Sequence, residues 1–300
     1  MAVLDIPPRM GEEQGRLPFR RASLQRETGM TFCLGMKVRE GLIGIADTRL
    51  TSGTETITAR KYSIYESEHQ SLFLLTSGLR SVRDKALTYF DELMDEQSGS
   101  MDRLYKAVNA FATCVRRVEQ EDKAALAQSG LTFNIHCLAG GQMPHDREHR
   151  LYLLYPQGNW VEIGEEAPYQ IVGTGGYGKP ILDRTLKYDD PMRFALKVGC
   201  LAFDSTRVSA SDVDFPLDIV LYAKDTFQIV HHRFQKEDLF EVSNWWNNRL
   251  RGAAQELPGA WIEPVFAHVP AARIVEPRAP EREAREAREE RPAAPAPRVK

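Results

Sequence analysis

The sequence predicts an α+β fold: a four-layer α-β-β-α sandwich in which two antiparallel sheets pack together between outer layers of helices. The first observation is the order of the predicted elements, which runs strands, two helices, strands, two helices, strands and a last helix. The second is that neighbouring strands are joined as hairpins, whereas parallel strands would need crossover helices between them. The third is that 300 residues with 42% hydrophobic content can bury one large core.

Composition excludes several classes of partner. The 39 Lys and Arg residues against 42 Asp and Glu residues give a net charge of −3, so the chain has no overall basic field to gather nucleic acid or anionic membrane. No apolar run reaches the ~20 residues that a membrane-spanning helix needs. The four cysteines lack C-x-x-C spacing, which indicates buried free thiols and a reducing, cytoplasmic location.

The chain is predicted to have three parts. Residues 1–30 contain Pro7-Pro8 and five arginines without periodicity, and we interpret them as a disordered leader, a propeptide, or an upstream mis-start with Met30 as the true first residue. Residues 31–262 form the folded domain. Residues 263–300 form a charged, proline-rich disordered tail.

A predicted hairpin at residues 31–47 carries the strongest functional signal. Apolar residues alternate with small or polar ones along 32–38, which is the period of a half-buried strand. The continuous apolar run 42–46 indicates a strand covered on both faces. A tight turn between the two strands places Thr31 opposite Asp47, either directly or one residue off.

These residues suit nucleophilic catalysis by a hydroxyl group. Threonine gains a built-in base if it is the first residue of the mature chain, because its own α-amine, which titrates near ~8, can take the hydroxyl proton. Lys61 follows Asp47 after a polar loop, and the pair could orient the Thr31 hydroxyl and ease its deprotonation. Each residue alone has an ordinary reading as a strand threonine, a turn former or a solvated charge. Their combined spacing favours catalysis.

At these positions the chain resembles the proteasome-type threonine peptidases, specifically their bacterial ancestral-beta-subunit branch. The run 47–53, Asp-Thr-Arg-Leu-Thr-Ser-Gly, is similar to the Asp-Ser-Arg-x-Thr-x-Gly segment of beta subunits, and Lys61 falls where those enzymes carry their catalytic lysine. The resemblance covers roughly residues 30–260 and is densest over 31–84. It implies the N-terminal-nucleophile hydrolase fold and a threonine-type endopeptidase.

The resemblance also implies roles for four further residues. Gly78, just before a predicted helix, falls at the family's oxyanion-hole glycine, where a backbone N–H at the positive helix end could hold the developing charge. Thr51 would hold the substrate backbone as an added strand. Thr174, in a Val-Gly-Thr-Gly segment, takes the place of a serine whose hydroxyl lies beside the nucleophile's amine. Ser211 is a weak candidate for amine support, because its loop does not keep the family's Asp-x-x-Ser spacing.

Two segments resemble cofactor-binding motifs, but each lacks a feature that the motif requires. The string His-Asp-Arg-Glu-His at 145–149 could bind zinc on a helix, but it follows Pro144 and lacks an apolar helical face, so we expect a hairpin loop. The glycine-rich segment 173–180 ends in proline where a phosphate-binding loop needs a hydroxyl for magnesium. We therefore expect neither a metal nor any other cofactor.

Local signals also predict where helices begin and what the last one does. Ser100 is a plausible N-cap for the second of two long helices that follow Gly78. Asp190 is expected to cap a later helix with Pro191 at its first position. The paired tryptophans Trp245 and Trp246 on the last helix are interpreted as core or subunit contact.

Three functions stay open at this point. The first is an endopeptidase that cleaves peptides or unfolded proteins inside a self-compartmentalised homo-oligomer, which in the resembled branch is a ring or an open helical washer. The second is a catalytically silent ring or scaffold subunit that keeps its leader. The third is an N-terminal-nucleophile amidase acting on a small molecule. The sequence identifies no unfoldase partner.

Overall fold

The computed structural model describes residues 31–52 and 55–269. The predicted leader, residues 1–30, lies outside the described residues, as does the predicted tail beyond residue 269. The chain divides into two compact units, with the boundary between Trp246 and Asn247. The strands, the paired helices that cover them and all the predicted site residues belong to the first unit.

The first sheet contains the predicted hairpin. Its strand order is β10-β1-β2-β11-β12, with every neighbouring pair antiparallel. The strands are β1 (Phe32–Val38), β2 (Gly41–Asp47), β10 (Tyr169–Gly173), β11 (Leu217–Ala223) and β12 (Ile229–Phe234). The register pairs Cys33 with Ala46, which sets Thr31 one residue out of line with Asp47, the second of the two registers that the sequence allows.

The second sheet is also antiparallel and has the order β5-β6-β7-β8-β9. Its strands are β5 (Tyr62–Ser67), β6 (Gln70–Gly78), β7 (Ile135–Gln142), β8 (Arg150–Leu154) and β9 (Trp160–Glu162). A separate two-stranded hairpin, β3 (Arg49–Ser52) with β4 (Glu55–Thr58), occupies the segment that the sequence analysis assigned to a polar loop. That assignment was wrong, because Thr56, Ile57 and Thr58 are all β-branched and favour a strand, although the two threonines are polar.

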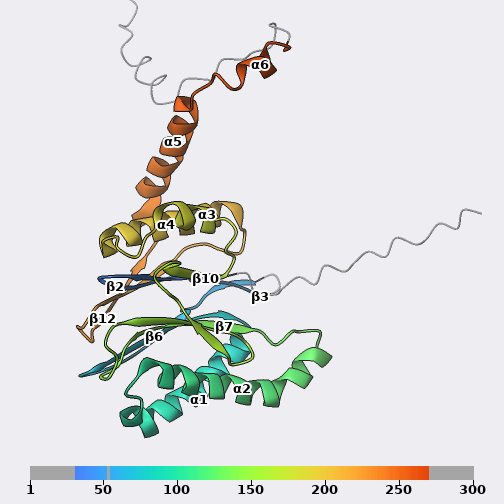
Figure 1. Cartoon of the computed structure of the whole chain (residues 1–300). Helices are drawn as coiled ribbons and strands as arrows, with labels where there is room; N and C mark the ends of the chain where they lie inside the picture. The colour runs from blue at the N-terminus through green and yellow to red at the C-terminus, as the bar shows by residue number, and fades with distance from the viewer. Residues whose placement is uncertain (1–30, 53–54, 270–300) are drawn as a thin grey trace, which may run out of the picture. The chain divides into compact units, whose positions relative to one another are not determined.

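Helices cover the outer faces of both sheets (Figure 1). The helices of the first unit are α1 (Arg80–Gln97), α2 (Leu104–Gln128), α3 (Lys179–Thr185), α4 (Met192–Ser209) and the beginning of α5 (Phe240–Glu256); α6 (Glu263–Phe266) belongs to the second unit. One core joins α1 and α2 to the second sheet, and another joins α3 and α4 to the first. In the described part of the chain, no helix is long and apolar enough to cross a membrane.

A third core lies between the two sheets. Cys33 and Val220 of the first sheet and Phe73 and Leu138 of the second belong to it, and all four are fully buried. The ring of Phe73 lies against Gly140, where a Cβ atom would come within 2.3 Å of it, so glycine leaves room for this ring between the sheets. With the two outer cores, this layer confirms the predicted four-layer sandwich of antiparallel sheets.

The prediction that Ser100 caps the second long helix is wrong. Helix α2 begins at Leu104, whose N–H donates a 2.8 Å hydrogen bond to Asp146 Oδ2. The same oxygen accepts a 3.1 Å hydrogen bond from the N–H of Met143. A carboxylate 42 residues away in the sequence therefore satisfies the helix terminus.

The predicted cap of α4 is also wrong. Asp190 accepts a hydrogen bond from the N–H of Lys187 and so closes the turn before the helix. Pro191 occupies the N-cap position, and the N–H of Met192 donates to Glu40 Oε2 at 2.8 Å. The turn between β1 and β2 thus supplies the carboxylate that stabilises this helix end.

The string at 145–149 lies in the loop between β7 and β8, where its two histidines have different environments. His145 is exposed, with Nδ1 3.0 Å from Asp102 Oδ2. His149 is fully buried and its Nε2–H donates to the carbonyl oxygen of Val38 at 2.8 Å, while its Nδ1 has no partner within residues 31–52 and 55–269. Burial lowers the pKa of His149 from 6.5, and the charge of Lys37 acts in the same direction.

Replacing His149 by glutamine should flatten the dependence of stability on pH. Because the folded state disfavours the charged imidazole, the stability that neutral His149 confers is present above the unfolded pKa of 6.5 and is lost as pH falls toward the lower folded pKa. Urea unfolding should show the wild type losing up to about 1.4 kcal/mol per pH unit more than His149→Gln below that value.

The exposed His145 provides the matched control. His145→Gln is made in parallel, because it removes a 64% exposed histidine of the same loop in place of the buried one. Parallel curves for the wild type and His149→Gln would contradict the prediction.

Candidate active site

Three side chains from separate segments meet at one end of the first sheet. Thr31 immediately precedes β1, Asp47 is the last residue of β2, and Lys61 immediately precedes β5. Their exposed fractions are 3%, 0% and 2%. Burial of a lysine and an aspartate at this level requires a specific set of partners.

The three side chains form a closed set of hydrogen bonds. Thr31 Oγ1 donates to Asp47 Oδ1 at 2.8 Å, and Lys61 Nζ donates to both Asp47 Oδ1, at 2.6 Å, and Thr31 Oγ1. Lys61 Nζ also donates to the carbonyl oxygen of Arg49 at 2.8 Å, and the N–H of Phe32 donates to Asp47 Oδ1 at 2.8 Å. An ammonium group has three donors, so Lys61 is fully satisfied in one orientation.

The electrostatics of this cluster favour charge at the Thr31 oxygen. Burial raises the pKa of the Asp47 carboxyl, while the Lys61 ammonium and the donated hydrogen bonds oppose that rise. An ammonium that already points at Thr31 Oγ1 stabilises the oxygen as its proton leaves. Asp47 Oδ2 is buried without a hydrogen-bond partner among the described residues, so its other oxygen bears all these contacts.

Strand β6 fixes the backbone around Lys61. The N–H of Thr76 donates to the carbonyl oxygen of Lys61 at 2.9 Å, and Cys33 Sγ lies 3.6 Å from the carbonyl oxygen of Thr76. Burial raises the pKa of Cys33 to about 12, so its thiol is protonated and unreactive at neutral pH. Sequence reasoning missed both contacts, because only the pairing of distant strands creates them.

Gly78 is the last residue of β6, two residues before α1 begins at Arg80. Its φ is +128°, and an added Cβ atom would lie 2.3 Å from the carbonyl oxygen of Asn134. Backbone conformation and crowding therefore require glycine here independently of any role in chemistry.

The segment at Gly173 and Thr174 lies directly against Thr31. The N–H of Thr174 donates to the carbonyl oxygen of Thr31 at 2.7 Å. Gly173 has φ +92°, and a Cβ atom there would lie 1.9 Å from that same oxygen, so only glycine permits the approach. Thr174 Oγ1 is buried and has no hydrogen-bond partner in the described part of the chain.

The remaining predicted residues, Thr51 and Ser211, lie in other segments of the described chain. Thr51 lies in β3, where it pairs with Thr56 of β4. Ser211 is exposed in the turn after α4, and among the described residues no hydrogen bond links it to Thr31. The same loop instead contributes Asp214, whose Oδ2 lies 3.4 Å from Arg49 Nη1. No local sequence signal distinguishes Asp214 from the other carboxylates of this loop.

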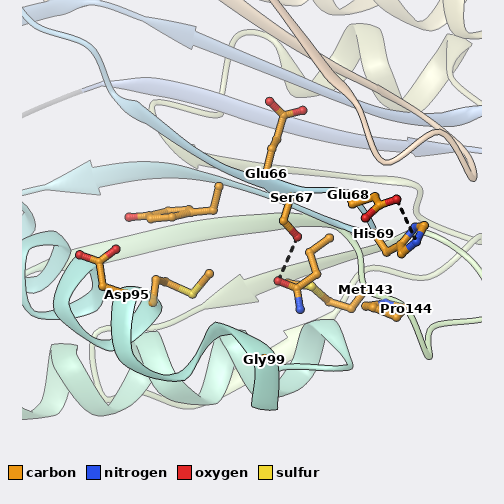
Figure 2. Close-up of a pocket in the computed structure, with 11 residues that line it drawn as sticks. Glu66, Ser67, Glu68, His69, Asp95, Gly99, Met143 and Pro144 are labelled. Atoms are coloured by element: carbon orange, nitrogen blue, oxygen red, sulfur yellow. Dashed lines mark hydrogen bonds and ion pairs between the residues drawn. The ribbon is translucent and has the colours of Figure 1, made fainter.

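A well-defined pocket lies away from the cluster. It has a volume of about 560 Å³ and is formed by the β5–β6 turn, the end of α1 and the loop after β7. Figure 2 shows Glu66, Glu68 and Asp95 around it, with His69 3.9 Å from Glu68. Lys61 stands at the opposite end of β5, and a rise of ~3.3 Å per residue separates the two ends by about 17 Å. This pocket is therefore separate from the cluster of Thr31, Asp47 and Lys61.

No metal-binding cluster accompanies these residues. Within the described ranges, no group of three or more His, Cys, Asp or Glu side chains could hold a metal ion. All four cysteines are free, and three of them are buried.

Comparison with known proteins gives a consistent answer at the level of structure. No protein-family model matches the sequence, and no curated protein matches it either. Among solved structures, the Anbu (Gly-1) mutant from Hyphomicrobium sp. strain MC1 has a TM-score of 0.70 and 28% identity, covering 76% of this chain and 99% of that one.

Two other neighbours agree. Anbu (ancestral beta-subunit) from Yersinia bercovieri has a TM-score of 0.71 and 27% identity, covering 76% of this chain and 98% of that one. The helical assembly of the Anbu complex from Pseudomonas aeruginosa has a TM-score of 0.72 and 27% identity, with 76% and 97% covered. In fold, the chain is thus a relative of the Anbu proteins, and the resemblance to the ancestral-beta-subunit branch that its sequence indicates is confirmed.

Proposed function

We propose that this protein is a threonine-type endopeptidase that uses Thr31 as an N-terminal nucleophile. The observation that carries the proposal is the buried cluster in which Lys61 donates to both Thr31 Oγ1 and Asp47 Oδ1. A buried ammonium group that donates to a threonine hydroxyl can stabilise the oxygen as its proton leaves. The free cysteines fit a reducing, cytoplasmic location.

The proposed reaction begins with attack of the Thr31 oxygen on a peptide carbonyl, while the free α-amine of Thr31 takes the hydroxyl proton. Lys61 stabilises the oxygen as the proton leaves, and Asp47 holds Lys61 in place. The Gly78 N–H binds the oxyanion of the tetrahedral intermediate. The amine then protonates the leaving nitrogen as the peptide bond breaks, and water hydrolyses the resulting ester.

Three further residues have proposed supporting roles. The unpartnered, buried Thr174 hydroxyl supports a role beside the amine, because the Thr174 N–H already binds the Thr31 carbonyl. Thr51 would align the substrate backbone along β3 as an added strand. Ser211, exposed in the turn after α4, would also support the amine.

Self-association forms part of the proposal. A neighbour in structure is described as a helical assembly of the Anbu complex, and we propose a homo-oligomer, ring or open helical washer, for this chain also. Trp245 is 53% exposed and stacks on Trp246 with ring centroids 6.5 Å apart, which gives an aromatic surface suited to a subunit contact. Peptides or unfolded proteins would be the substrates.

Active protein should begin at Thr31. While Met30 is attached, the nitrogen of Thr31 is an amide without useful basicity, so no proton relay can operate. Intact-mass measurement of the active species should show loss of residues 1–30, and Thr31→Ala should keep them if the cut is autocatalytic. Full activity in protein that retains them would refute the mechanism, whereas a retained leader without activity would favour the silent-subunit alternative.

Neutralising the Lys61–Asp47 pair should separate catalysis from stability. Lys61→Met alone leaves Asp47 buried without its cation and should lower the free energy of unfolding by about 3–5 kcal/mol. The double variant Lys61→Met/Asp47→Asn should recover much of that stability, because no uncompensated charge remains.

Both variants should cleave casein at least about a hundredfold more slowly than the wild type, since the electrostatic support of the Thr31 oxygen is gone. Denaturant unfolding and casein hydrolysis measure the two effects separately. A stable double variant with activity close to that of the wild type would contradict the catalytic assignment. Cleavage of small amides but not casein by the wild type would instead favour the amidase alternative.

Trp245→Glu should weaken self-association, because it places a charge in the proposed aromatic contact. Light scattering at micromolar concentration should give a lower mass for this variant than for the wild type. Tyr177→Glu is the control, since Tyr177 has a similar exposed fraction of 48% but precedes α3. A monomeric wild type would contradict the proposed assembly.

A further inference from the structure

A group of arginines borders the proposed site at the beginning of α1. Arg80 is the first residue of this helix, two residues after Gly78, and Arg83 lies one turn along. Arg83 Nη1 donates to the carbonyl oxygen of Arg60, the residue before Lys61, at 3.3 Å. The first turn of α1 is therefore in direct contact with the segment that positions the catalytic lysine.

Arg80 and Arg83 share the carboxylate of Asp84. Asp84 Oδ1 accepts from Arg83 Nη2 at 2.7 Å, and Asp84 Oδ2 accepts from Arg80 Nε at 3.2 Å. One aspartate thus serves two guanidinium groups, and each guanidinium has five N–H donors. Donors of Arg80 remain for another acceptor, and its side chain is 56% exposed.

Arg60 adds a third positive charge to this group. Its guanidinium lies over the ring of Tyr62, with Cζ 4.9 Å from the ring centroid, and the residue is exposed. Lys61 adds no net positive charge to this group, because Asp47 pairs with it. Three arginines against one aspartate leave a positive surplus on the side of the site next to Gly78.

Resting on the proposed function, we infer that the enzyme selects substrates with an acidic side chain on the acyl side of the cleaved bond. If the Gly78 N–H holds the oxyanion, the residue that supplies that carbonyl lies beside the residues that follow Gly78. These begin with Leu79 and Arg80. A carboxylate there meets the free donors of Arg80, and the planar fork of arginine suits carboxylate geometry.

The experiment measures peptide binding without requiring cleavage. Labelled tetrapeptide amides that end in Asp, Asn or Lys are titrated by fluorescence anisotropy into the purified wild type, Arg80→Glu and Arg117→Glu, each with its N-terminus determined by intact mass. Asp and Asn have the same shape, so their difference reports charge alone. Arg117→Glu is the matched control, because Arg117 is also 56% exposed and pairs with an acidic residue four positions along its helix, Glu121.

The wild type and Arg117→Glu should bind the Asp peptide about five- to tenfold more tightly than the Asn peptide. Arg80→Glu should lose this preference or favour Lys. Equal binding of the three peptides by the wild type, no binding at millimolar concentration, or equal loss of preference in both variants would overturn the inference.

Hydrolysis of the same sequences extended beyond the terminal residue separates this inference from the proposed function. Cleavage without preference for Asp contradicts the inference and supports the peptidase. Preferential binding of the Asp peptide without any cleavage supports the inferred preference for an acidic side chain and contradicts the proposed peptidase activity.

Discussion

The buried contact between Lys61 and Asp47 is the constraint on which the rest of the site depends. A lysine that is 2% exposed loses most of its hydration, and only a complete set of acceptors offsets that loss. Those acceptors come from β2, from the backbone at the start of β3 and from the residue that precedes β1. The first sheet and the start of the second must therefore be assembled together before the ammonium is satisfied. This requirement couples the folding of the sandwich to the geometry at Thr31.

The hairpin and the helix layers could be predicted because their signals are local. Alternation over residues 32–38 and the apolar run 42–46 fix two strands and the turn between them, and the structure has both strands at nearly those bounds. The spacing of Thr31, Asp47 and Lys61 then followed from the hairpin together with a resemblance in sequence. Their meeting was predictable even though the exact partners of Lys61 were not.

What the sequence could not reveal depends on contacts between distant segments. Both helix caps were predicted from nearby residues, yet Asp146 and Glu40, which are far away in the chain, accept the hydrogen bonds. The backbone oxygen of Arg49 as the third acceptor of Lys61 is equally invisible, because every residue has such an oxygen. The hairpin β3–β4 was missed for another reason: its threonines count as polar in a hydropathy pattern although their β-branched side chains favour strands.

The hydrogen bond from Thr174 to the carbonyl oxygen of Thr31 has a consequence for the proposed cut before Thr31. A newly made chain end normally frays, because its first residue loses a covalent neighbour and has little else to hold it. In this structure the N–H of Thr174, the residue after β10, holds the carbonyl oxygen of Thr31. Lys61 and Asp47 hold its hydroxyl, so both sides of Thr31 are anchored. Cleavage would release an amine without releasing the residue that bears it. The new N-terminus would be an ordered part of the sheet from the moment of cleavage.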